Sequence, residues 1–360
     1  MRKLCVCLEM LEMEGGGEKH LHRGHGEYRG HREEHRLKPV PLGACGRQLY
    51  WLTEFWGSGG MSLEKKDERG TEQRLAASKT LDRMTALEIV QLMNREDRKV
   101  AEAVERELPA IARAVDAIVE AMRAGGQLIY IGAGSSGRMG VLDAAEVPPT
   151  FGISQEKIRA FIAGGRYAVT GAVEGAEDAT QAGVTALRAA IVGKGDVVVG
   201  IAASGTTPYV LAAIKYARGR GATTIAITSN EHMPLAQIAE IAISVEVGAE
   251  VLTGSTRLKA GTAQKMVLNM LSTAAMVRLG HAYENLMIDA VMSNEKLQGR
   301  AVRILMEASG AEVSAVEDAL RAAGHDMRVG LVMLKMGVGA GEARKKLAAA
   351  RGDLRRALGE

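Results

Sequence analysis

The sequence LIYIGAGSSG, residues 128–137, indicates the architecture of this 360-residue chain. Its first half is an apolar run of strand length that passes through a glycine-rich turn into a helical pattern, which predicts a βα unit. The turn has the form G-x-G-x-x-G, which also occurs around dinucleotides, but a dinucleotide site needs an acidic residue about 20 positions on to hold the ribose. The second predicted strand ends in IAGGRY, without a carboxylate. The adjacent hydroxyls of Ser135 and Ser136 favour a phosphate monoester instead.

Four further strand candidates follow, with helical stretches between them. They are IRAFIA (158–163), DVVVGIA (196–202), TTIAIT (223–228) and AISVEV (242–247). Strands that alternate with helices predict an α/β fold with a doubly wound, mostly parallel sheet of about five strands. Because the strands are short and nearly all apolar, we expect helices on both faces of this sheet.

A second hydroxyl-rich turn, AASGTTP (202–208), follows the third predicted strand. The carboxyl ends of neighbouring parallel strands meet at one edge of a sheet, so we expect both turns to face one crevice. The residues predicted to hold a phosphosugar there are Ser135, Ser136, Gly137, Ser204, Gly205, Thr206 and Thr207. Either turn alone could instead serve only tight packing.

A third loop, TGSTRLKAGT (253–262), carries Arg257 and Lys259 just before a long helical pattern. Arginine and lysine side chains there could pair with an anion, and Lys259 is included among the predicted substrate-binding residues. The alternative is an ordinary solvated loop with two surface cations.

Two carboxylates stand out by their positions as candidates for proton transfer. Glu146 lies near the end of the helix that the first turn opens, and we expect Pro148–Pro149 to end that helix. Glu177 lies in EGAED, at or just before the start of the next helix. A helix N-terminus favours the ionised form and a helix C-terminus the protonated form, which predicts Glu177 as a base and Glu146 as an acid. A capping acid and a solvated turn residue are the alternative interpretations.

The sheet is flanked by helical segments. A capping box of Thr85 and Glu88 opens the helical pattern that Gly125 stops, and after residue 261 the strands give way to one long helix and several short ones. The expected short helices include one opened by Ser314 with Glu317, and no internal repeat is evident. The predicted domains are N-terminal helices at 61–126, the phosphosugar-binding sheet domain at 127–284 and a C-terminal helical region at 285–360.

Residues 1–60 differ from the rest in composition. They contain all three cysteines, both tryptophans and five of the eight histidines, without zinc-ligand spacing. We interpret them as an extension that is either disordered or the result of a start codon assigned too early, with Met61 as the natural start. We favour this interpretation over a metal-binding module. In the whole chain, a net charge of +3 and 3% aromatic residues argue against nucleic-acid binding. The chain contains no run of about 18 apolar residues, so we predict no membrane span.

Long motifs resemble the N-acetylmuramic acid 6-phosphate etherase family, which has the sugar isomerase (SIS) fold. They are GAGSSGRMGVLDAAEVPPTFG (132–152), AVEGAED (172–178), GIAASGTTPYV (200–210), TGSTRLKAGTAQKMVLNMLSTAAM (253–276) and NEKL (294–297). The resemblance implies a cytoplasmic lyase of bacterial cell-wall recycling that releases D-lactate and N-acetylglucosamine 6-phosphate. It implies a homodimer with sites near the subunit interface, and no metal or other cofactor. The family's proton donor falls on Glu146, its second acid on Glu177 and its phosphosugar contact on Ser136.

The chain departs from the family pattern at three places. Ser135 replaces a usual threonine, Thr206 replaces a frequent arginine, and Leu75–Ala76 replaces an Asn-Pro pair. A non-catalytic phosphosugar sensor, a phosphosugar isomerase and a nicotinamide dehydrogenase remain rival interpretations. Release of D-lactate distinguishes the etherase from all three.

Overall fold

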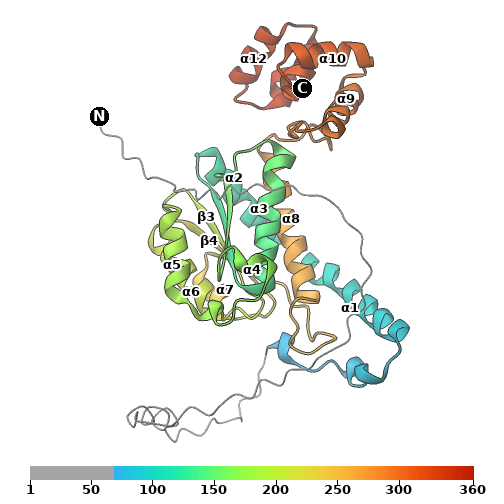
Figure 1. The fold of residues 1–360 in the computed structure, drawn as a ribbon. Helices are drawn as coiled ribbons and strands as arrows, with labels where there is room; N and C mark the ends of the chain where they lie inside the picture. Colours follow the sequence, from blue (N-terminus) through green and yellow to red (C-terminus); the bar gives the residue numbers. More distant parts are fainter. Residues whose placement is uncertain (1–68) are drawn as a thin grey trace, which may run out of the picture. The chain divides into compact units, whose positions relative to one another are not determined.

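The computed structural model describes residues 69–360, so the interpretation of residues 1–60 lies outside the described part of the chain. A five-stranded sheet with the order β2-β1-β3-β4-β5 forms its centre, and every neighbouring pair is parallel (Figure 1). The strands are β1 (Leu128–Gly132), β2 (Ile158–Ile162), β3 (Val197–Ile201), β4 (Thr223–Thr228) and β5 (Ile241–Ser244). The predicted fold class is therefore confirmed.

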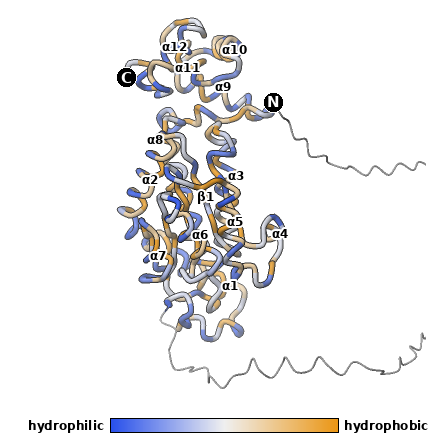
Figure 2. Tube along the Cα trace, turned by 90° about the vertical axis from the view of Figure 1, so that its left-hand side faces the viewer, coloured by the Kyte–Doolittle hydropathy of each residue, from blue (hydrophilic) through white to orange (hydrophobic). Residues whose placement is uncertain are grey.

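Helices cover both faces of the sheet because both faces are apolar. Every residue of β1 and of β3 is buried, and the trace around β1 is among the more hydrophobic parts of the chain (Figure 2). One apolar cluster joins the sheet to α2 (Leu108–Arg123), α3 (Gly134–Phe151) and α8 (Lys259–Arg278). The opposite cluster joins it to α5 (Thr180–Ala189), α6 (Pro208–Gly219) and α7 (Pro234–Ile238). None of the described helices is long and apolar enough to cross a bilayer.

The N-terminal helical pattern forms two helices, where the sequence predicted one continuous pattern. The capping box is confirmed, since Thr85 N–H donates to Glu88 at 2.7 Å and Glu88 N–H donates to Thr85 at 3.3 Å. Helix α1 (Ala86–Arg106) ends before Glu107, and α2 has Pro109 in its first turn. Proline lacks the N–H that would continue the ladder but fits a first turn, which explains the break.

The expectation that Pro148–Pro149 ends α3 is wrong, because the helix continues to Phe151 and stops at Gly152 with φ 63°. The two prolines remove two ladder donors. The hydroxyl of Thr150 donates to the Glu146 carbonyl at 2.7 Å, and Val147 and Phe151 are buried in the core. These contacts hold the last turn, so Glu146 lies within the helix.

The C-terminal helices have an apolar core of their own. They are α9 (Glu295–Ser309), α10 (Val313–Ala322), α11 (Met327–Met336), α12 (Ala340–Ala349) and α13 (Leu354–Leu358). Helix α10 begins at Val313 without a side-chain cap, so the expected cap at Ser314 is wrong. Asp326 caps α11 by accepting from Val329 N–H at 3.1 Å, and Gly337 ends it with φ 64°.

The pair α12–α13 repeats the pair α10–α11, although the sequence showed no evident repeat. Both pairs join two helices through two left-handed residues followed by an aspartate cap. The left-handed residues are Gly324 and His325 in the first turn, and Arg351 and Gly352 in the second. The same backbone bond closes each turn, from His325 N–H to Leu320 at 2.9 Å and from Gly352 N–H to Leu347 at 2.8 Å. Few side chains recur, which is why the pattern is weak in the sequence.

Candidate active site

A crevice opens where β1 and β3 end side by side. The chain leaves β1 toward β2 on one side and leaves β3 toward β4 on the other, so the strand order reverses at this point. Open α/β sheets bind ligands at such a position. The cavity has a volume of about 500 Å³. Its lining includes Arg69, Glu72, Ser135, Ser136, Glu177, Asp178, Ser204, Thr206, Thr207, Gly254 and Thr256.

The first turn brings a backbone and two hydroxyls to the crevice. Gly132 and Gly137 pack against each other so closely that a Cβ on Gly132 would lie 2.8 Å from the Gly137 nitrogen. This close packing sets the start of α3 directly at the end of β1. Ser136 is 8% exposed and Ser135 is half-buried, both in the first turn of α3. Free N–H groups and the helix dipole at this end suit an anion.

The second turn contributes hydroxyls from the other strand. Thr206 donates to the Ser204 hydroxyl oxygen from its N–H at 3.2 Å and from its own hydroxyl at 3.1 Å. Gly205 has φ 68°, a conformation that favours glycine and lets this turn fold back before α6. Ser204, Thr206 and Thr207 line the same cavity as the serines of the first turn. The two turns therefore converge, while the predicted Gly137 and Gly205 shape them without lining the cavity.

The third loop reaches the crevice through Gly254 and Thr256, and its predicted cations lie elsewhere. Lys259 is 2% exposed, and its ammonium lies 2.8 Å from the Glu96 carboxylate of α1. Burial works to raise the pKa of Glu96, but hydrogen bonds from Lys259 and Lys99 outweigh it and hold the pKa below its ordinary value. Lys259 thus pairs with a protein carboxylate, outside the lining of the crevice.

A buried carboxylate closes this third loop. Glu250 is fully buried and accepts from the backbone N–H groups of Lys259 at 3.1 Å and Ala260 at 3.0 Å. Burial raises the pKa of Glu250, although both backbone hydrogen bonds act to lower it. Because these bonds join the two ends of the loop, they fix where Gly254 and Thr256 meet the crevice.

The predicted acids lie in different places within one chain. Glu177 is exposed on the short helix η4 (Ala176–Asp178), just before α5, and it lines the crevice. Glu146 is exposed on α3 and does not line the crevice. It follows Ser136 by ten residues of helix, a distance of roughly 15 Å along the axis. The crevice of a single chain therefore holds only one of the two predicted acids.

Exposed apolar side chains lie on α3, N-terminal to Glu146, and on the short helix that follows β2. Leu142, one turn earlier on α3, is 47% exposed, and Tyr167 of α4 (Tyr167–Thr170) is 76% exposed. Val169 of α4 and Val173, shortly after this helix, are exposed as well. The Arg138 guanidinium donates to the carbonyls of Val169 and Gly171, which fastens this segment to α3.

Sequence reasoning missed three charged residues of the crevice. Arg69 and Glu72 come from the segment before α1, and Asp178 follows Glu177 directly. Among the described residues that line the crevice, Arg69 is the only lysine or arginine. It supplies a positive charge to the site, where Thr206 stands in place of the family's frequent arginine. No motif marks Arg69 or Glu72, because only the fold brings that segment to the ends of the strands.

This crevice, with its two hydroxyl-bearing turns at the switch point of a parallel sheet, defines a phosphosugar-binding domain of the SIS class. Residues 110–218 match the family model of the glucokinase regulatory protein N-terminal SIS domain, and residues 178–274 match the SIS domain model. The chain is 51% identical to an N-acetylmuramic acid 6-phosphate etherase of Pectobacterium atrosepticum over 80% of this chain and 95% of that protein. It is 53% identical to that of Serratia proteamaculans over 80% and 97%, and 54% identical to that of Symbiobacterium thermophilum over 74% and 89%. The chain belongs to the N-acetylmuramic acid 6-phosphate etherase family.

Proposed function

We propose that the protein cleaves the D-lactyl ether of N-acetylmuramic acid 6-phosphate, as a lyase that yields N-acetylglucosamine 6-phosphate and D-lactate. The observation that carries this proposal is the position of Glu177 in a crevice lined by hydroxyls from both turns. Hydroxyls alone would suffice for binding, whereas a carboxylate beside them supports proton transfer. The names of the relatives support the choice of substrate. We place the reaction in the cytoplasm, in the recycling of cell-wall sugars.

The phosphate group would lie between the two turns. Ser136 and Ser204, with Thr206 and Thr207, offer hydroxyl donors, and the first turn of α3 offers backbone N–H groups. Arg69 adds a positive charge at the rim of the same cavity. With the phosphate held there, the sugar would extend toward Glu177.

The chemistry requires a base and an acid. Ring opening makes the proton at C2 of the sugar acidic, because it then lies next to an aldehyde. Glu177 removes that proton, the bond from C3 to the ether oxygen breaks, and Glu146 protonates the oxygen as D-lactate leaves. Water then adds to C3 of the unsaturated aldehyde, giving its proton to Glu146, and Glu177 returns the proton to C2. The sum is one water consumed and one ether bond cleaved.

A homodimer would bring the two acids together. Glu146 lies outside the crevice of its own chain, one turn after the exposed Leu142, and Tyr167 of α4 is exposed as well. Exposed apolar patches on a folded domain often mark protein interfaces. We infer a twofold interface that brings Glu146 of one copy to the Glu177 crevice of the other.

The test is direct measurement of D-lactate. The purified protein, incubated with N-acetylmuramic acid 6-phosphate, should release D-lactate and N-acetylglucosamine 6-phosphate in equal amounts. An isomerised phosphosugar without lactate, or binding without turnover, would contradict the proposal.

A further inference from the structure

The two repeated helix turns of the C-terminal region show which side chains the turn itself requires. Aligned on the caps Asp326 and Asp353, Gly324 corresponds to Arg351, and Val329 corresponds to Arg356. The first pair forms the same turn without either arginine. Arg351 has φ 55°, a left-handed conformation that costs a non-glycine residue free energy. The two arginines are therefore not needed for the local fold.

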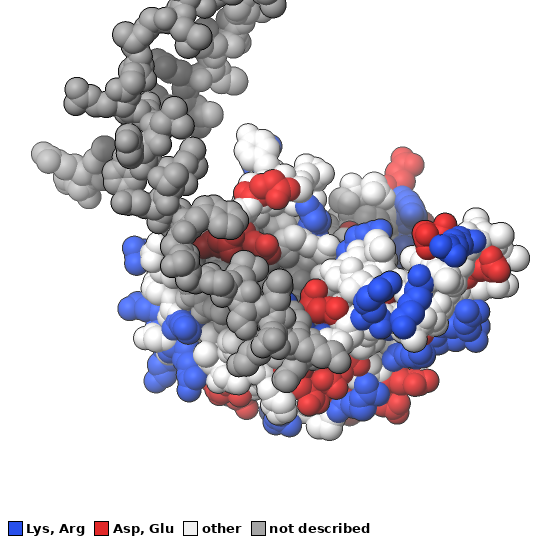
Figure 3. Space-filling model, turned by 90° about the horizontal axis from the view of Figure 1, so that it is seen from below, with Lys and Arg blue, Asp and Glu red and all other residues white. Residues whose placement is uncertain are grey.

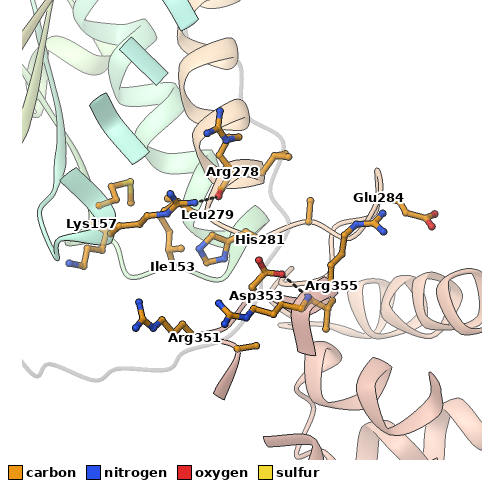
Figure 4. A pocket seen from close by; sticks show the side chains of 17 residues that line it. Ile153, Lys157, Arg278, Leu279, His281, Glu284, Arg351, Asp353 and Arg355 are labelled. Carbon is orange, nitrogen blue, oxygen red and sulfur yellow. Dashed lines mark hydrogen bonds between the residues drawn. The ribbon is translucent and has the colours of Figure 1, made fainter. Parts of the chain in front are cut away.

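The second turn lines a cavity of about 910 Å³ together with the end of α8 and the segment around Ile153. In Figure 4, Lys157, Ile153 and His281 lie on one side, and Arg351, Asp353 and Arg355 lie on the other. The lysine and arginine residues of the lining are Arg123, Lys157, Arg278, Arg351, Arg355 and Arg356. The acidic residues of the lining are Glu284 and Asp353.

Much of this positive charge is not neutralised. Lys157 donates to the Gly125 carbonyl, and Arg123 donates to the Arg278 carbonyl at 2.9 Å, which leaves both charges in place. The carboxylate of Asp353 is used as the cap of α13, accepting from Arg356 N–H at 3.0 Å.

Ion pairs account for only two of these cations. Arg278 pairs with Asp116 at 3.2 Å, and Arg355 pairs with Glu360 at 3.2 Å. Within residues 69–360, no carboxylate lies at ion-pair distance from Arg351 or Arg356. On the described surface seen in Figure 3, by contrast, cations and carboxylates are interspersed.

The cavity also has apolar walls. Met122, Ile153, Val277, Leu279 and Leu354 line it between the cations. The volume lies in the range of sites for organic ligands and exceeds what a single phosphate needs. Cations on facing sides suit a ligand with several phosphates, and apolar side chains suit the face of a flat ring.

We propose that this cavity is a binding site for a nucleoside polyphosphate, separate from the crevice at β1 and β3. The phosphates would lie against Arg351 and Arg356, opposite Lys157 and Arg278, and the base would lie against Ile153 and Leu354. This site shares no lining residue with the crevice, so it does not depend on the proposed function.

Isothermal titration calorimetry of the full chain tests the site with ATP and with inorganic tripolyphosphate as probes. ATP should bind saturably, and tripolyphosphate more weakly because it lacks the ring. The variant Arg351→Gly/Arg356→Val carries the residues of the first turn and should fold. It should weaken ATP binding by at least about 10-fold, because two charge-assisted contacts are lost. Arg278→Gln, on the opposite wall, should weaken binding as well.

Two controls locate the ligand. Arg321→Ala removes an exposed arginine of the same region outside the cavity, and Ser204→Ala alters the crevice; both should leave ATP binding unchanged. Absence of saturable ATP binding would overturn the proposal. ATP binding by the double variant as tight as that of the natural protein would also overturn it. The same holds if Arg321→Ala weakened ATP binding as much as the double variant does. A loss of ATP binding with Ser204→Ala would place ATP in the crevice and so overturn the proposal too. Tripolyphosphate binding as tightly as ATP would overturn the role of the ring.

Discussion

A carboxylate oxygen of Glu250 accepts a hydrogen bond of 3.1 Å from the backbone N–H of Lys259, and both residues are buried. The other oxygen accepts from Ala260 at 3.0 Å. This arrangement makes the start of α8 and the loop at the crevice one rigid unit. The geometry of the site thus depends on residues that touch no ligand.

Glu250→Gln should weaken both the fold and substrate binding. Glutamine offers one acceptor oxygen, so one buried N–H loses its partner at a cost of about 1–3 kcal/mol. Because Gly254 and Thr256 then shift, we expect KM for the phosphosugar to rise more than kcat falls. Urea unfolding and steady-state kinetics measure the two effects. Glu246→Gln, an exposed change of the same kind, should alter neither.

Lys259→Met should destabilise the protein by roughly 3 kcal/mol, because it leaves the buried carboxylate of Glu96 with Lys99 alone. Adding Glu96→Gln should recover part of this loss in urea unfolding. If instead stability were unchanged and only KM rose, Lys259 would act on substrate, as the sequence predicted.

The buried carboxyl of Asp143 should make the free energy of unfolding depend on pH. It accepts from the Tyr130 hydroxyl at 2.7 Å and the Ser272 hydroxyl at 3.0 Å, yet burial dominates and raises the pKa of Asp143. A carboxyl whose pKa is higher in the folded state than in the unfolded state stabilises the fold at pH values below the unfolded-state pKa, about 4. This stabilisation is lost as the pH rises through the folded-state pKa.

The non-titrating variant Asp143→Asn isolates this contribution. The free energy of unfolding of the natural protein, relative to the variant, should be largest near pH 4 and decline toward pH 7. Asp82→Asn, at an exposed site, should give a flat difference. A difference that grows with pH would show that Asp143 is stabilised as the anion.

Isotope exchange at C2 of the sugar should distinguish the roles of Glu146 and Glu177. Glu177→Gln should abolish uptake of solvent deuterium, because the base is lost. Glu146→Gln should keep the uptake but slow lactate release, with kcat lowered about 10²–10⁴-fold. Asp178→Asn, a neighbouring carboxylate in the same lining, should have a smaller effect. The opposite pattern would exchange the roles of Glu146 and Glu177.

The sequence predicted the sheet well because its signals are local. Buried strands such as LIYIG and TTIAIT have the predicted bounds, and the capping pair Thr85 and Glu88 is present. One error arose where a tertiary contact outweighs a local rule, and another where the local signal of a proline was not used. Buried Phe151 carries α3 past two prolines, and Pro109 divides the first helical pattern.

The candidate site was predictable where motifs mark it and not elsewhere. Both hydroxyl-rich turns converge as expected, since parallel strands end at one edge, and Glu177 lines the same crevice. The partner of Lys259 was not predictable, because Glu96 lies on a distant helix. Arg69 likewise reaches the crevice only through the fold.

D-lactate release by a mixture of two inactive variants tests most directly whether one site combines Glu177 of one copy with Glu146 of another. Glu146→Gln and Glu177→Gln proteins, unfolded and refolded together in equal amounts, should form mixed dimers that each retain one complete site. We predict about a quarter of the natural activity from such random pairing. A mixture as inactive as either variant alone would contradict a site built from Glu177 of one copy and Glu146 of another.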